Sequence, residues 1–177
     1  MSRLMENVMK KEPEYLLWRQ TDPHFNETEA WPAGLFPEAQ YRYFRDAGCL
    51  VCSLAVMLRH YGLETADGPG FDPLILNERL IRCGAFDPSA DLDLSYIRMI
   101  YPLEYAGAVP FSREALERIT KSGGLCLITV PGQNAEYHFL AYLRPLPGDA
   151  EVFDPLHGTG KLSAYPRICG IRVFRRV

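Results

Sequence analysis

GCLVCSLAVMLRHYG, at residues 48–62, is the stretch of sequence from which the fold can be predicted. Its apolar residues follow the i, i+3, i+4, i+7 spacing of a helix with one buried stripe, namely Val51, Leu54, Ala55 and Leu58. Gly62 suits the left-handed position that ends a helix. We therefore expect a helix from Cys49 to Tyr61, with Cys49 as its first residue.

A cysteine at the start of a helix has a chemical advantage over other cysteines. The unsatisfied backbone N–H groups and the positive end of the helix dipole favour the thiolate form of Cys49. The same N–H groups can receive an oxyanion. Gly48, directly before the cysteine, would leave room for a substrate backbone to approach. The alternative interpretation is that Cys49 is a small core residue.

The rest of the chain predicts helices first and strands afterwards. Residues 21–38 are rich in proline and glycine, which is typical of a long ordered loop. Two further helices are expected, from Pro73 to Cys83 and from Ser112 to Lys121, with Ser112 as the N-cap of the second. Beyond residue 124 the pattern becomes strand-like, with four expected strands at 125–130, 137–143, 151–153 and 168–174. This order predicts an α+β fold.

His138 and Asp154 fall on the two strands of the expected hairpin. His138 is a lone polar residue in an apolar strand, and Asp154 follows the apolar pair Val152 and Phe153. A turn centred on residue 147 places His138 opposite roughly residue 156, close to Asp154. Neighbouring strands lie about 4.8 Å apart, so the carboxylate can orient the imidazole. The other interpretations are a hydrogen-bonded core histidine and a turn-forming aspartate before proline.

Cysteine, histidine and aspartate are the groups needed for acyl transfer by a thiol nucleophile. The other histidines fit the role of base less well. His60 lies 11 residues further along the Cys49 helix, hence about 16 Å away. His24 lies in the long loop, and His157, just after Asp154, is a reserve candidate.

Composition limits the classes of protein to consider. The 177 residues, 47% apolar and 23% charged, suit a single domain spanning 1–177, with 1–14 as an N-terminal extension. With 19 basic and 22 acidic residues, a nucleic-acid partner is not expected. No apolar run is long enough for membrane insertion, and no signal peptide is visible, so we expect a cytoplasmic protein.

Several short motifs together resemble a known family. The 48–62 stretch is similar to the nucleophile helix of papain-like cysteine peptidases of the double-glycine-leader, bacteriocin-processing type. The resemblance extends from about residue 15 to the C-terminus, and four further segments carry it: Gln20-Thr21-Asp22-Pro23, the region from Asp72 to Phe86, Glu136-Tyr137-His138-Phe139, and Val152-Phe153-Asp154-Pro155.

The resemblance implies a papain-like fold, in which the nucleophile helix packs on a C-terminal antiparallel sheet. It also implies Cys49 as nucleophile, His138 as base and acid, and Asp154 as the orienting residue. Gln20 would donate to the oxyanion, with Gln40 as its rival. The expected activity is hydrolysis of a peptide or related amide bond, on a peptide or protein substrate, without a metal or organic cofactor.

Three other interpretations remain open. The first is a catalytically inactive peptide-binding module on the same fold. Its groove, like that of an active enzyme, would be lined by aromatic residues of the N-terminal third: Trp18, Phe25, Trp31, Phe36, Tyr41, Tyr43 and Phe44. The alternative interpretation, which is favoured for any single ring, is packing under the long loop. The second is a thiol-disulfide oxidoreductase, because Cys49 and Cys52 form a CxxC motif. The third, a metal site on Cys49, Cys52, Cys83 and a histidine, lacks a second close pair. Cys83, Cys126 and Cys169 are expected to be buried.

Overall fold

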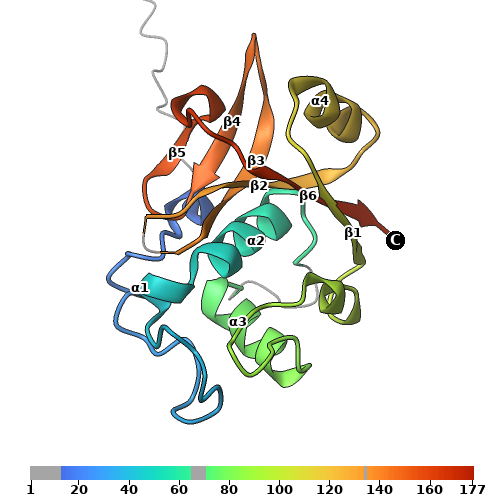
Figure 1. Ribbon diagram of the computed structural model, residues 1–177. Helices are drawn as coiled ribbons and strands as arrows, with labels where there is room; N and C mark the ends of the chain where they lie inside the picture. The colour runs from blue at the N-terminus through green and yellow to red at the C-terminus, as the bar shows by residue number, and fades with distance from the viewer. Residues whose placement is uncertain (1–12, 65–70, 134) are drawn as a thin grey trace, which may run out of the picture.

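A six-stranded antiparallel sheet with helices on both faces forms the framework of the chain (Figure 1). The computed structural model describes residues 13–64, 71–133 and 135–177, so residues 1–12 of the expected N-terminal extension lie outside the described residues. The strands are ordered β1-β6-β2-β3-β4-β5 across the sheet. The α+β class predicted from the sequence is therefore confirmed.

Most elements are joined by short connections, but the long loop separates the first short helix from the first α-helix. The strands are β1 (Leu103–Val109), β2 (Leu125–Pro131), β3 (Tyr137–Leu146), β4 (Asp149–Asp154), β5 (Gly158–Lys161) and β6 (Gly170–Arg176). The α-helices are α1 (Phe44–Ala47), α2 (Cys49–His60), α3 (Pro73–Arg82) and α4 (Arg113–Lys121). Among the described residues there are also three short 3-10 helices: η1 (Glu14–Leu17), η3 (Leu94–Met99) and η4 (Leu162–Ala164).

The three predicted helices are present, and Ser112 caps the third as expected, while Asp72 is an N-cap that the sequence analysis did not name. The Asp72 side chain accepts a hydrogen bond from the Ile75 N–H at the start of α3. The Ser112 hydroxyl accepts from the Ala115 N–H at the start of α4. Gly62, just after α2, has φ +66°, a backbone conformation that favours glycine.

Helix α2 is buried on all sides, which corrects the expectation of one buried stripe. Every residue from 51 to 58 is buried. The sheet covers one side of the helix, and α3 lies on another (Figure 1). The long loop closes it further, because Phe25 and Trp31 belong to the same apolar cluster. A helix enclosed in this way is apolar around its whole circumference.

The sequence analysis did not predict two of the strands, β1 and β5, and the final strand, β6, begins later than expected. β1 precedes α4, so the strands do not all follow the helices. It pairs with β6 at the edge of the sheet, and its residues are mostly half-buried or exposed. β5, with the sequence GTGK, pairs with β4. The final strand starts at Gly170 and not at Ile168.

Most aromatic residues of the N-terminal third pack inward and do not line an open groove. Phe25, Trp31 and Phe44 are buried in the cluster around α2, and Trp18 and Phe36 pack against it. Only Tyr43 is among the exposed large side chains. These rings therefore stabilise the long loop against the helices, as the packing interpretation predicts, and do not form the groove that was the other expectation.

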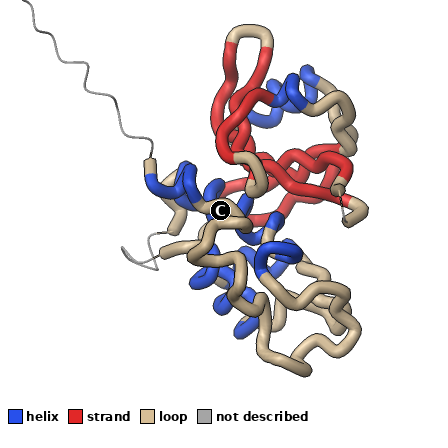
Figure 2. The backbone as a smooth tube through the Cα atoms, turned by 90° about the vertical axis from the view of Figure 1, so that its left-hand side faces the viewer, coloured by secondary structure: helices blue, strands red, loops and turns tan. Residues whose placement is uncertain are grey.

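The sheet separates two apolar clusters. One contains residues of α2, α3 and the long loop, and the other lies under α4. Figure 2 shows helices on both sides of the strands. Successive strand residues such as Leu127 and Ile128 point into different clusters, as alternation along a strand requires. No helix among the described residues is long and apolar enough to cross a membrane.

Candidate active site

The β3–β4 hairpin brings His138 and Asp154 into direct contact. Its register pairs Ala141 with Phe153, so that position 138 faces the residues just beyond the end of β4. The His138 Nε2 lies 2.8 Å from the Asp154 Oδ1, and the two side chains are 11% and 2% exposed. The contact inferred from the turn position is thus present.

Cys49 lies on the other side of the imidazole. Helix α2 packs against β3, where the Ser53 hydroxyl donates to the Phe139 carbonyl at 2.7 Å, next to His138 in the chain. The Cys49 and His138 side chains are hydrogen-bonded to each other. Because Nε2 is taken by Asp154, Nδ1 is the ring nitrogen that faces the thiol. The imidazole therefore lies between a thiol and a carboxylate.

These contacts raise the pKa of His138. Burial alone would lower it, but the hydrogen bonds with Asp154 and Cys49 outweigh burial and raise the pKa to about 9. The pKa of Asp154 moves the other way: burial would raise it, but hydrogen bonds from His138, Tyr165 and the Leu156 N–H keep it below its usual value. The pair is therefore an imidazolium and a carboxylate near neutral pH.

Tyr165 is a site residue that the sequence analysis missed. Its hydroxyl donates to Asp154 Oδ2 at 2.5 Å, while the Leu156 N–H donates to Oδ1 at 2.7 Å. With the bond from His138, these donors leave the buried carboxylate well satisfied. Tyr165 follows η4 in a loop that returns to the hairpin, and no local pattern in the sequence indicates such a return.

The structure places Gln20 near this cluster and Gln40 on the surface. Gln20 is 4% exposed, and its N–H donates to the Pro155 carbonyl at 3.0 Å, directly after Asp154. Its side-chain Nε2 donates to the Arg45 carbonyl, and its Oε1 is buried without a hydrogen-bond partner. Gln40 is exposed in the long loop.

The hydrogen bond from the Gln20 side chain to the Arg45 carbonyl lies close to the start of α2. In a continuous helix, the Arg45 carbonyl would be the acceptor for the Cys49 N–H four residues later. The chain turns at Gly48 between α1 and α2, so Cys49 begins a new helix. Its N–H is one of the donors without an intrahelical partner, and Gln20 lies against the carbonyl that precedes it.

Gly48 has a packing role, which corrects the role in substrate approach inferred from the sequence. A Cβ at this position would lie 2.5 Å from the Phe44 carbonyl oxygen and 2.6 Å from the Phe44 ring. The space beside Gly48 is therefore filled by the protein itself. Glycine is needed here because α1 and α2 approach each other closely at this turn.

The remaining cysteines differ in burial, and all five are free thiols. Cys52 and Cys126 are buried, and burial raises the pKa of the Cys52 thiol well above its usual value. Cys83 is half-buried and Cys169 is exposed, so the expectation that both are buried was wrong. A buried, protonated Cys52 is poorly suited to the thiolate exchange that a redox CxxC performs.

The other histidines lie apart from the thiol. His60 contacts the Tyr15 hydroxyl and the Leu143 carbonyl, each at 3.0 Å. His24 is exposed, with its Nε2 4.0 Å from a carboxylate oxygen of Asp72. His157 is exposed beside the hairpin, where its backbone N–H donates to the Asp154 carbonyl. No cluster of metal-ligating side chains occurs within the described ranges.

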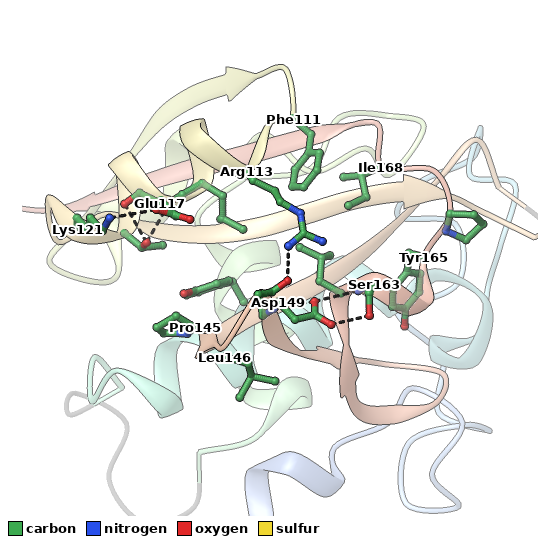
Figure 3. A pocket seen from close by; sticks show the side chains of 17 residues that line it. Phe111, Arg113, Glu117, Lys121, Pro145, Leu146, Asp149, Ser163, Tyr165 and Ile168 are labelled. Atoms are coloured by element: carbon green, nitrogen blue, oxygen red, sulfur yellow. Dashed lines mark hydrogen bonds and ion pairs between the residues drawn. The ribbon is translucent and has the colours of Figure 1, made fainter.

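Two pockets adjoin this region and share Tyr165 and Pro166. The smaller, of about 250 Å³, is bounded by His138 and Asp154 and by residues from the loops at 156–157 and 165–167. The larger, of about 660 Å³, lies between α4, the turn of the β3–β4 hairpin and η4 (Figure 3). Only the smaller pocket contains members of the Cys49–His138–Asp154 cluster.

The chain was also compared with known proteins. No protein-family model matches the sequence, and neither the curated proteins nor the solved structures give a match.

Proposed function

We propose that the protein is a cysteine peptidase or amidase, with a papain-like arrangement of its helices and sheet, that hydrolyses a peptide or related amide bond. One observation carries the proposal: His138 is hydrogen-bonded to the Cys49 thiol on one side and to the buried Asp154 carboxylate on the other. A nucleophile, a base and an orienting acid in this sequence of contacts form the usual machinery of acyl transfer.

The reaction would proceed in two steps. The Cys49 thiolate attacks the carbonyl carbon of the substrate amide, and the His138 imidazolium protonates the leaving nitrogen as the C–N bond breaks. The neutral imidazole then takes a proton from water, whose oxygen attacks the thioester. The C–S bond breaks, which releases the carboxylic acid and restores the Cys49 thiolate beside the His138 imidazolium. Asp154 stabilises the imidazolium in the first step and holds the ring in place in both.

Two donors are available for the oxyanion that forms during each attack. Cys49 is the first residue of α2, so its backbone N–H has no intrahelical acceptor. The Gln20 amide carries a second N–H besides the one bonded to the Arg45 carbonyl. A backbone N–H and a neutral amide can stabilise the negative oxygen without changing their own charge. Gln20 is therefore preferred to the exposed Gln40.

The experiment compares the reactivity of the five cysteines within one folded protein. At pH 7 with limiting iodoacetamide, Cys49 should be alkylated roughly tenfold or more faster than the exposed Cys169, because only Cys49 is paired with an imidazolium. His138→Ala should remove this advantage, whereas His24→Ala, at an exposed site, should retain it. Mass spectrometry of the digested protein assigns the alkylated residue.

The outcome separates the proposal from its rivals. Equal rates at Cys49 and Cys169 in the folded protein would argue for an inactive binding module. A reversible disulfide between Cys49 and Cys52, lost in Cys52→Ser together with reductase activity, would argue for a redox protein. Rapid alkylation of Cys49 that depends on His138 supports the peptidase or amidase.

A further inference from the structure

The smaller pocket carries an excess of positive charge and of hydrogen-bond donors. It is lined by Arg167 in addition to the His138 imidazolium, whereas Asp154 is the only carboxylate among its lining residues. Asp154 is already bonded to His138, Tyr165 and the Leu156 N–H. It therefore has little capacity left to neutralise a further cation at this place.

Arg167 is the basic group in this pocket whose side chain has no partner among the described residues. Its side chain is exposed and makes no ion pair or hydrogen bond with residues 13–64, 71–133 or 135–177. The acidic residue closest in sequence to His138, Glu136, interacts with the neighbouring Tyr137 hydroxyl. A free guanidinium offers a planar fork of donors that matches a carboxylate.

The position of the pocket determines which part of a substrate it can hold. During acyl transfer the imidazolium must lie within hydrogen-bond distance of the leaving nitrogen. The part of the substrate attached to that nitrogen consequently lies on the His138 side of the site. The pocket is bounded by His138 but not by Cys49, so it lies beside the imidazole and can receive the part of the leaving group that extends past the ring.

We infer that this pocket binds a carboxylate on the leaving-group side of the scissile bond, with Arg167 as the residue that selects it. The inference rests on the proposed function and adds a substrate class to it. The carboxylate is either the C-terminal carboxylate of the substrate or an aspartate or glutamate side chain, since both present the same two oxygens to a guanidinium.

Two alkylating reagents of similar size test the inference without a known substrate. Iodoacetate carries a carboxylate and iodoacetamide does not. The quantity measured is the rate of Cys49 alkylation by iodoacetate divided by the rate with iodoacetamide. We expect this ratio to fall about two- to fivefold in Arg167→Gln, as suits one partly exposed charge pair. Arg118→Gln removes the same charge from the exposed face of α4 and should leave the ratio unchanged.

The same measurement distinguishes a failure of this inference from a failure of the proposed function. If Cys49 reacts no faster than Cys169 with iodoacetamide, the proposed function is wrong. If Cys49 reacts fast with iodoacetamide, but its reagent ratio is the same in Arg167→Gln as in the unaltered protein, only the carboxylate inference is overturned. Higher salt should reduce the ratio in the unaltered protein, because salt screens exposed charges.

Three small peptides distinguish the two sources of the carboxylate. N-acetyl-Ala-Ala has a C-terminal carboxylate, N-acetyl-Ala-Glu amide has a side-chain carboxylate, and N-acetyl-Ala-Ala amide has neither. We expect one or both of the acidic peptides to protect Cys49 from iodoacetamide, and this protection to weaken in Arg167→Gln but not in Arg118→Gln. Equal protection by the neutral peptide would overturn the inference.

Discussion

The two pockets that meet at Tyr165 differ in volume and in the state of their charged groups. The 660 Å³ pocket has its charges satisfied internally: Glu117 pairs with Lys121, Asp149 accepts from Ser163, and Arg113 donates to the Gly148 carbonyl (Figure 3). The 250 Å³ pocket contains the imidazolium of His138 and Arg167, whose side chain has no partner in the part of the chain that the structure describes.

This difference shows that volume alone does not identify a reactive site. A large apolar pocket arises here because the short α4 and η4 cover this face of the sheet only in part. The smaller pocket is distinguished by groups whose chemistry is still available. The following predictions test whether reactivity is confined to the smaller pocket.

The largest expected effect comes from Asp154→Asn. An amide cannot stabilise the His138 imidazolium or hold the same tautomer, so kcat/KM for a fluorogenic peptide amide should fall about 10³- to 10⁴-fold. Asp149→Asn is the matched control, because it alters a carboxylate of the larger pocket that bonds Ser163. A comparable loss in both variants would contradict the distinction between the pockets.

Raising the pH should stop hydrolysis while alkylation of Cys49 continues. Since the pKa of His138 is about 9, hydrolysis should fall about tenfold per pH unit above that value, as the leaving nitrogen loses its proton donor. Alkylation of Cys49 should persist, because it needs no proton donor. A hydrolysis rate that stays constant to pH 10 would contradict this role of His138.

The same raised pKa predicts a pH dependence of stability. The pKa of His138 is raised above its usual 6.5, so its stabilising contribution is complete below pH 6.5 and is lost as the pH rises through about 9. The difference in free energy of unfolding between the unaltered protein and His138→Gln, measured in urea, should therefore shrink over this interval.

Tyr165→Phe should have an intermediate effect. The variant removes one hydrogen bond to the buried Asp154, and kcat should fall roughly tenfold because a bond to a charged group contributes about 1.5 kcal/mol or more. The pKa of Asp154 should rise, so the variant should lose stability at a higher pH on acidification. Tyr142→Phe, in the larger pocket alone, is the control and should leave kcat unchanged.

The smallest effect is expected from filling the larger pocket. Glu117→Trp places a bulky ring at its α4 wall, and Glu117→Gln breaks the same ion pair with Lys121 without filling the space. Both variants should keep kcat/KM within about twofold, since exposed ion pairs of this kind contribute little. A tenfold loss in Glu117→Trp alone would mean that substrate extends into the larger pocket.

The sequence allowed the helices and the central hairpin to be predicted because their signals are local. Ser112 caps the helix that follows it, and the hairpin turn fixes the register between His138 and Asp154. β1 gave no such signal, because its sequence LEYAGAV is interrupted by Gly107 and lies half-exposed at an edge. β5 is short and contains two glycines.

Parts of the site depend on contacts that no local pattern records. Tyr165 and Arg167 reach the hairpin only because the chain returns to it after η4. The burial of Gln20 depends on its bonds to Pro155 and Arg45. The role of Gly48 was misjudged because the close approach of Phe44 becomes visible only in three dimensions.

The bond between Ser53 and the Phe139 carbonyl joins residues that lie 86 positions apart in the chain. The His138–Asp154 contact spans only 16 positions and can form as soon as the hairpin closes. Contacts between distant segments form late because closing a long loop costs more entropy. During refolding, His138 and Asp154 should therefore form their contact before Cys49 reaches its position beside His138. The recovery of rapid Cys49 alkylation would then report the docking of α2 onto the sheet.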